Sequence, residues 1–204
     1  MRKLVYLVAV SIDGFISDRS GGMESLMSHV DEEFLTFLGT EYPETLPTGV
    51  RRALGLADVE NKHFDTVVQG RGSYRLALDA GVTSPYGHLR EYVASATLEK
   101  SPDPNVEIIS DDVIGRIREL KREVSEFDIW LCGGARIAGE LRDEIDELVI
   151  KTYPLLLGTG MPMFDLGAGV GAGAEAEPVV SEFAFDASRA FGNGIVVRTY
   201  RRKR

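Results

Sequence analysis

Residues 4–10 read Leu-Val-Tyr-Leu-Val-Ala-Val, an almost wholly apolar run that is rich in β-branched side chains. A strand in which nearly every position is apolar has to be buried on both faces, which is typical of the interior of a parallel sheet. The pair Asp13-Gly14 ends the run, because Asp-Gly is a common turn sequence. This segment therefore predicts a central strand in a sheet that other elements cover on both sides.

Further apolar runs follow, and segments with helical spacing separate most of them. We expect strands over 66–68, 92–94, 106–109, 128–132 and 147–153. We expect helices over 29–38, 51–59, 73–78, from Asp111 or Asp112 to about 125, and after Gly134. Two strands, over 179–185 and 195–200, are expected to end the chain as an antiparallel pair, and 158–176 is expected to be a loop. This alternation predicts an α/β fold of three layers, α/β/α, around a mostly parallel sheet.

Composition limits the class of protein further. A chain of 204 residues predicts one domain over 1–204. The formal net charge of -9 argues against binding of nucleic acid through a basic surface. The single cysteine, Cys132, excludes an internal disulfide and fits a reducing cytoplasm. The run over 4–10 is too short to span a membrane and lacks a small-residue cleavage site, so we expect a cytoplasmic protein without a membrane partner.

Two adjacent glycines, Gly133 and Gly134, stand between an expected strand and an expected helix. Glycine lets the backbone approach a ligand closely, and a helix start offers unpaired N–H groups and a favourable dipole. This order of elements suits a diphosphate, and it equally suits a plain strand-to-helix turn. The interpretation therefore depends on whether other strand ends agree.

Three other expected strands end in glycine or hydroxyl residues, over 11–14, 70–73 and 95–97. Ligands of an open α/β sheet bind beyond the carboxyl ends of its parallel strands. Arg71 offers a forked, charged contact to a 2′-phosphate, and Ser95 and Thr97 add hydroxyl donors. Together with the diglycine, these motifs predict a site for a phosphorylated dinucleotide.

Taken in order, the motifs resemble the dihydrofolate reductase superfamily, and especially the branch typified by the reductase domain of bacterial riboflavin biosynthesis. Residues 11–16 resemble the Ser-x-Asp-Gly signature of that branch, and residues 70–74 its Gly-Arg-x-Thr/Ser element. Residues 132–135 resemble its Gly-Gly cofactor turn, and residues 154–160 its Pro-x-x-x-Gly-x-Gly segment, which Phe164 follows. The resemblance extends over nearly the whole chain.

The resemblance implies a dihydrofolate reductase-like fold and an NADPH-dependent oxidoreductase that acts as a homodimer. Apolar final strands, which otherwise leave an adhesive sheet edge, also favour the dimer. The residues implied for the cofactor site are Ala9, Gly70, Arg71, Gly72, Ser73, Ser95, Thr97, Gly133, Gly134, Ala135, Arg136 and Ile137. Ser11, Asp13 and Gly14, with Ala9, are implied to border the nicotinamide and the substrate.

Hydride transfer also needs a proton donor and substrate contacts, and the N-terminal third supplies candidate carboxylates. Asp13 is the candidate catalytic residue. Glu24 and Asp31 are candidate substrate contacts, because a carboxylate on the first helix binds the pterin in dihydrofolate reductases proper. The three histidines show no metal-ligand spacing, so no metal site is expected.

The expected substrate is a small heterocycle, namely a pyrimidine of riboflavin biosynthesis of the 5-amino-6-(5-phosphoribosylamino)uracil kind. A folate is disfavoured because the only tryptophan, Trp130, lies far from the N-terminal third. Two alternatives remain open, which are a dihydrofolate or pteridine reductase and a non-catalytic nucleotide-binding protein of the same fold. Segment 39–63 is longer than a compact member of the family needs and is expected to shape or cover the substrate pocket.

Overall fold

The computed structural model describes residues 1–166 and 180–203. One eight-stranded sheet has the order β5-β4-β3-β6-β1-β7-β10-β9. Its strands are β1 (Leu4–Ser11), β3 (Phe64–Gly70), β4 (Arg90–Ala94), β5 (Val106–Ile109), β6 (Asp128–Gly133), β7 (Glu147–Tyr153), β9 (Phe183–Ala190) and β10 (Val196–Arg202). A small second sheet pairs β2 (Phe15–Ser17) with β8 (Met161–Pro162).

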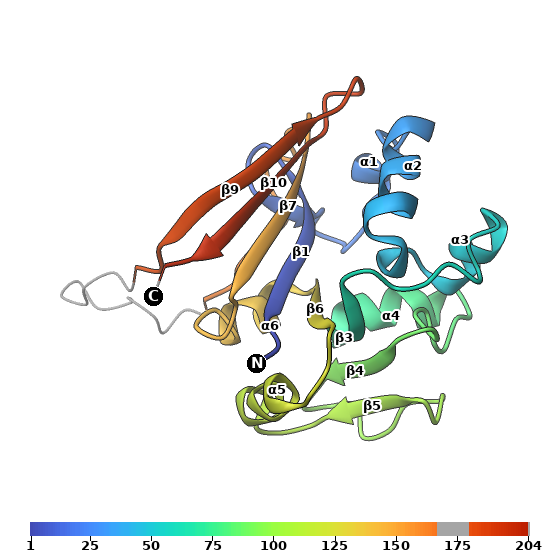
Figure 1. Cartoon of the computed structure of the whole chain (residues 1–204), viewed down its shortest axis with the longest axis vertical. Helices are drawn as coiled ribbons and strands as arrows, with labels where there is room; N and C mark the ends of the chain where they lie inside the picture. The colour runs from blue at the N-terminus through green and yellow to red at the C-terminus, as the bar shows by residue number, and fades with distance from the viewer. Residues whose placement is uncertain (167–179, 204) are drawn as a thin grey trace.

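Seven helical segments accompany the sheet in the described part of the chain. They are α1 (Glu24–Met27), α2 (Glu32–Glu41), the 3-10 helix η1 (Pro43–Thr45), α3 (Thr48–Ala53), α4 (Arg71–Asp79), α5 (Val113–Arg122) and α6 (Ala135–Glu140). The strands from β5 to β7 are all parallel, whereas β10 pairs antiparallel with both β7 and β9. Figure 1 shows the resulting C-terminal hairpin at one edge of the sheet. The predicted fold class is confirmed.

Strand β1 lies in the middle of the sheet and is buried along its whole length, between β6 and β7. Leu4 and Tyr6 point into a core that contains apolar residues of α5 and α6. Val5 and Leu7 point into a second core, which contains Phe34 of α2. Because successive side chains of a strand point to opposite faces, the apolar run of β1 requires helices on both faces and so produces three layers.

The expected strand over 179–185 is wrong in position. Strand β9 spans Phe183–Ala190, and residue 179 lies outside the described residues. All but the first of its residues are exposed, so β9 is held mainly by backbone pairing to β10, and only Phe183 at its start packs against the core. The apolar pattern therefore could not locate it. The loop expected over 158–176 contains β8, and its part from 167 onward is not among the described residues.

Segment 39–63 folds into the end of α2, η1 and α3. Its anchor is Glu44, which is fully buried. The carboxylate of Glu44 accepts hydrogen bonds from the backbone N–H groups of His63 at 2.7 Å and Phe64 at 2.9 Å. The segment is therefore tied to the start of β3, at the amino end of the sheet.

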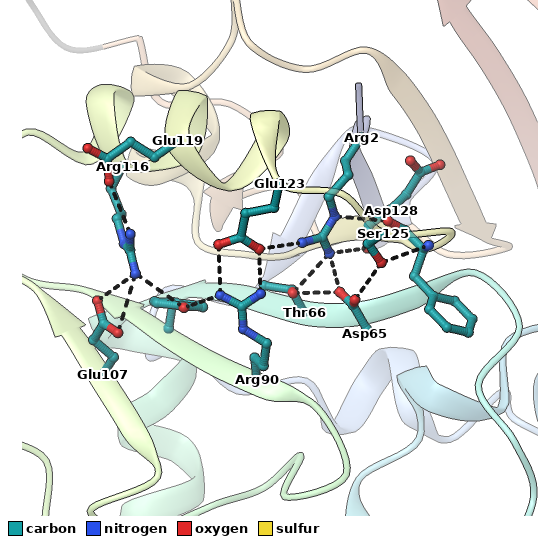
Figure 2. A network of polar contacts seen from close by, with 12 residues as sticks. Arg2, Asp65, Thr66, Arg90, Glu107, Arg116, Glu119, Glu123, Ser125 and Asp128 are labelled. Atoms are coloured by element: carbon teal, nitrogen blue, oxygen red, sulfur yellow. Dashed lines mark hydrogen bonds and ion pairs between the residues drawn. The ribbon is translucent and has the colours of Figure 1, made fainter.

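A network of ion pairs holds the amino ends of the strands together (Figure 2). Arg2, which is 3% exposed, donates to Asp65, to Thr66 at 3.0 Å and to Glu123 at 3.1 Å. The carboxylate of Glu123 also accepts hydrogen bonds from both terminal nitrogens of Arg90. The network joins the starts of β1, β3 and β4 to the loop after α5. It therefore lies at the opposite end of the strands from Ser11, where β1 ends.

We expect Arg2→Ala to lower the free energy of unfolding by about 3 kcal/mol, because it leaves carboxylates beside the sheet without their buried cation. Lys3→Ala is the matched control, since Lys3 is half-exposed in its pair with Glu147 and such pairs contribute about 1 kcal/mol or less. Urea unfolding of both variants measures the difference. Equal, small losses would show that the network does not stabilise the fold.

Candidate functional site

The carboxyl ends of five parallel strands lie along one edge of the sheet. These strands, β1, β3, β4, β6 and β7, end at Ser11, Gly70, Ala94, Gly133 and Tyr153. All four polar or glycine motifs found in the sequence follow β1, β3, β4 and β6. The fold therefore collects them at the same edge.

The ends of β3 and β6 approach each other through glycine backbone. A Cβ atom on Gly134 would lie 3.5 Å from the Cα of Gly70 and 3.3 Å from the Cγ2 of Ile137. Gly133 and Gly134 have φ angles of 148° and 105°, which favour glycine over every other residue. The position of a Cβ on Gly133 is 3.8 Å from the hydroxyl of Ser73. These residues form a backbone cradle, and a side chain at Gly134 would crowd it.

The start of α6 contributes to this edge mainly through its backbone. The side chains of Ala135 and Ile137 are buried in the core, at 3% and 4% exposure. The side chain of Arg136, between them, is exposed. Arg136 is therefore the side chain of this turn that is free to reach a ligand in solution.

Arg71, Ser95 and Thr97 come together beside the cradle. Arg71 is exposed at the start of α4, and its guanidinium donates a hydrogen bond to the hydroxyl of Thr97. Ser95 is buried, and its hydroxyl accepts from the N–H groups of Thr97 at 3.3 Å and Leu98 at 2.9 Å. Ser95 thus shapes the turn that presents Thr97 to Arg71. Gly72, next in α4, is exposed and has open space around it.

Asp13 joins the end of β1 to the segment after β7. The hydroxyl of Ser11 donates to its carboxylate at 2.5 Å, and the N–H groups of Leu157 and Gly158 donate at 3.2 and 2.7 Å. Gly14 completes the turn with a φ of 85°. The hydrogen bond from Ser11, with those from the backbone, lowers the pKa of Asp13 because it favours the charged carboxylate. At neutral pH this carboxylate is ionised and holds no proton to donate.

Glu24 lies in α1, and Asp31 immediately precedes α2. Asp31 caps α2, accepting from the N–H of Phe34 at 2.9 Å. Glu24 is exposed in the first turn of α1, beside Gly22. Among the described residues, no hydrogen bond or ion pair joins either carboxylate to the strand-end motifs.

The sequence interpretation missed a set of polar side chains on the face of the sheet that packs against α2. The set consists of Gln69 on β3, Glu91 on β4, Cys132 on β6 and Lys151 on β7, and the hydroxyl of Tyr86 lies 3.8 Å from the thiol of Cys132. A sign of it was present in the sequence, because Lys151 is in phase with the buried residues Val149 and Tyr153 of the same strand. Its neighbours on other strands became known only from the pairing of the strands.

Two further observations concern ions and membranes. Within residues 1–166 and 180–203, no group of three or more histidine, cysteine, aspartate or glutamate side chains is arranged to hold a metal ion. None of the helices in these ranges has the length and apolar content needed to cross a membrane.

The chain is similar to two Bacillus subtilis proteins, which are named as the uncharacterized proteins YwjB and YyaP. YwjB is 28% identical over 165 residues, which cover 80% of this chain and 83% of YwjB. YyaP is 25% identical over 176 residues, which cover 80% of each protein. No family model matches the chain.

Solved structures are similar over almost the full chain. A candidate riboflavin biosynthesis protein from Shewanella sp. PV-4 is 24% identical, with a TM-score of 0.68 and full coverage of both chains. The Thermotoga maritima diaminohydroxyphosphoribosylaminopyrimidine deaminase/5-amino-6-(5-phosphoribosylamino)uracil reductase has 16% identity and a TM-score of 0.60, over 99% of this chain and 57% of that one. Dihydrofolate reductase from Enterococcus faecalis, in complex with NADP(H), has 13% identity and a TM-score of 0.59, over 99% and 97%.

These similarities define the fold. The chain has the dihydrofolate reductase-like fold, so the resemblance carried by the ordered motifs is confirmed at the level of architecture. Fold alone does not assign an activity, and the activity has to be argued from the residues at the carboxyl edge of the sheet.

We expect Gly134→Ala to destabilise the protein by about 1–3 kcal/mol, because the new methyl group meets Ile137 and Gly70 and the positive φ is strained. Gly72→Ala is the control with the same chemical change, since its Cβ meets open space within a helix and is expected to stabilise by about 0.5 kcal/mol. Thermal and urea unfolding measure both. If Gly134→Ala were as stable as the parent, the close approach of β3 and β6 would be disproved.

Proposed function

We propose that the protein is an NADPH-dependent reductase that transfers a hydride to a small heterocycle, such as the phosphoribosylaminopyrimidine of riboflavin biosynthesis, in the cytoplasm. The observation that carries the proposal is the backbone cradle of Gly70, Gly133 and Gly134 beside the exposed pair of Arg71 and Thr97. The similar structures support it, since two are named as reductases and one of these is complexed with NADP(H).

The residues present fit the cofactor. The cradle would receive the diphosphate, because its glycines leave room for close approach and the hydroxyl of Ser73 lies beside Gly133. Arg71 and Thr97 would hold the 2′-phosphate, since a guanidinium forms forked, charge-assisted hydrogen bonds to phosphate oxygens. In a chain with a net charge of -9, such a local cation is needed to attract a phosphorylated ligand. When bound, NADPH supplies the hydride.

The end of β1 would border the substrate. Ala9 places only a methyl group on the α2 face of this strand, two residues before Ser11. The hydrogen bonds of Asp13 to Ser11, Leu157 and Gly158 hold the following turn in place. In this proposal Asp13 is a positioning residue, because its contacts keep it ionised. Glu24 and Asp31 remain proposed substrate contacts from the α1–α2 side.

We expect Arg71→Ala to weaken NADPH binding at least about 10-fold and to leave NADH binding unchanged, because a hydrogen bond to a charged group contributes about 1.5–3 kcal/mol. Arg75→Ala is the matched control on the same helix, where Arg75 is exposed and pairs with Asp79. Isothermal titration calorimetry measures both cofactors.

A parent protein that fails to bind NADPH at high micromolar concentration contradicts the proposal. Oxidation of NADPH is then followed over a panel of pyrimidines, pterins and quinones. Turnover of pterins instead of pyrimidines favours a pteridine reductase. Binding without turnover favours a non-catalytic nucleotide-binding protein.

The proposed enzyme is a homodimer that pairs through the edge strand β9. This strand is exposed over nearly its whole length, and Phe185 on it is 62% exposed. An open edge strand with an exposed apolar side chain is a template for pairing with another chain. Because every molecule of this protein carries the same edge strand, a second copy of β9 is available in solution as its pairing partner.

We expect light scattering to give twice the chain mass of 22.4 kDa, and Phe185→Lys to shift the protein to monomer. Val124→Lys serves as the control, since Val124 is fully exposed after α5, the helix that follows β5 at the opposite edge of the sheet from β9. A monomeric parent protein, or a dimer that survives Phe185→Lys unchanged, would rule out this interface.

A further inference from the structure

Lys151 occupies an unusual place for a lysine. It lies in β7, paired with Ala9 of β1 on one side and with Val197 of β10 on the other. The residues two positions away on the same face, Val149 and Tyr153, are each 1% exposed. Lys151 is itself only partly exposed, at the carboxyl end of the sheet. A cation placed there has a desolvation cost, and that cost requires a compensating interaction.

Within the described residues, no such interaction is made by the amine of Lys151. It takes part in none of the hydrogen bonds or ion pairs among them, whereas Lys121, which is 5% exposed, forms an ion pair with Asp146 at 2.6 Å and donates to the carbonyl of Glu144 at 2.9 Å. Lys121 thus has a structural role, and its buried amine is fully paired with neighbouring oxygens. Lys151 is left with hydrogen-bond donors that a ligand can use.

Of the polar groups on this face of the sheet, Cys132 lies two strands from Lys151 and Glu91 lies four strands away. Ala9 of β1, which places only a methyl group on this face, is the paired neighbour of Lys151 on the side of Cys132. The thiol of Cys132 is 3.8 Å from the hydroxyl of Tyr86. Glu91 accepts hydrogen bonds through Oε1 from the hydroxyl of Ser84 and the backbone N–H of Tyr86, whereas its buried Oε2 has no partner among the described residues. None of these groups neutralises the amine.

Burial sets the protonation of this cluster. It raises the pKa of Cys132 to about 11, so the thiol stays protonated at neutral pH. It lowers the pKa of Lys151 to about 8, since the charged amine loses hydration. A general acid works best when its pKa is near the working pH, because it then holds a proton and releases it readily. Asp13, by contrast, is ionised and has no proton to give.

We propose that the amine of Lys151 binds the acceptor substrate and donates the proton that completes its reduction. This inference rests on the proposed reductase function and deepens it. The acceptor atom is a carbonyl oxygen or an imine nitrogen next to the carbon that is reduced. An acceptor with a fixed positive charge at that position is excluded by repulsion.

The step balances. The carbon of the substrate C=O or C=N bond accepts the hydride, with its two electrons, from the reduced nicotinamide cofactor, which leaves as NADP+. The π electrons move to the oxygen or nitrogen, which takes the proton as one Nζ–H bond of Lys151 breaks. The amine is then reprotonated from water.

An NMR pH titration of protein labelled with carbon-13 at the lysine ε-carbons measures the pKa of the Lys151 amine. This measurement does not depend on enzymatic turnover. The resonance that is missing in Lys151→Met belongs to Lys151, and its midpoint is expected near pH 8, against about 10.4 for an ordinary lysine. Lys100, an exposed lysine, is the internal reference. A midpoint of Lys151 equal to that of Lys100 overturns the proposal.

Activity and binding complete the test, with NADPH and whichever pyrimidine, pterin or quinone the parent enzyme reduces. Lys151→Met is expected to bind NADPH within twofold of the parent and to lose turnover by about 100-fold or more. Lys151→Arg keeps the charge and is expected to hold KM near the parent value while kcat falls. The parent kcat is expected to decline as the pH rises through about 8, since the amine loses its proton.

Full turnover of Lys151→Met overturns the role of Lys151 and leaves the reductase function intact. A parent protein that binds no NADPH, or reduces no member of the panel, overturns both.

Discussion

Strand β1 is buried on both faces, and this burial dictates the layers of the fold and the position of the candidate site. Its side chains alternate between two cores, with Leu4 and Tyr6 in one and Val5 and Leu7 in the other. Neither core closes without helices, so α2 covers one face and α5 and α6 cover the other. The strand also connects the two ends of the sheet. Arg2, just before β1, belongs to the ion-pair network, and Ser11, its last residue, lies beside the candidate site.

The two edges are stabilised in different ways. At the amino edge, buried charges satisfy one another, and the interactions are internal to the protein (Figure 2). At the carboxyl ends of the strands, glycine backbone lies beside the exposed side chains of Arg71 and Thr97, and Lys151 has no partner among the described residues. Groups that are left unsatisfied in a folded protein cost stability, and such a cost is typical of positions that serve a ligand. The contrast supports placing the function at the carboxyl edge.

Much of the architecture was predictable from residue patterns. The strands of the parallel part were found because they are buried and apolar, and their ends were found because glycine and hydroxyl residues interrupt the pattern. Strand β9 was misplaced, since an exposed edge strand carries no apolar pattern. Ser95 was predicted as a cofactor contact, and the structure shows its hydroxyl accepting hydrogen bonds from the N–H groups of Thr97 and Leu98. Local sequence indicated where Ser95 lies and could not indicate which neighbour its hydroxyl meets.

Residue patterns suffice to predict the fold class and the order of the strand-end motifs, because periodicity and turn residues act over a few positions of the chain. Which of these motifs meet depends on the packing of the folded chain. Gly134 approaches Gly70, and Asp13 holds Gly158, through contacts between residues far apart in the chain. The same holds for Lys151, whose character depends on Ala9 and Cys132, one and two strands away in the sheet. Strand order and register arise from packing of the whole chain, so no local pattern contains them.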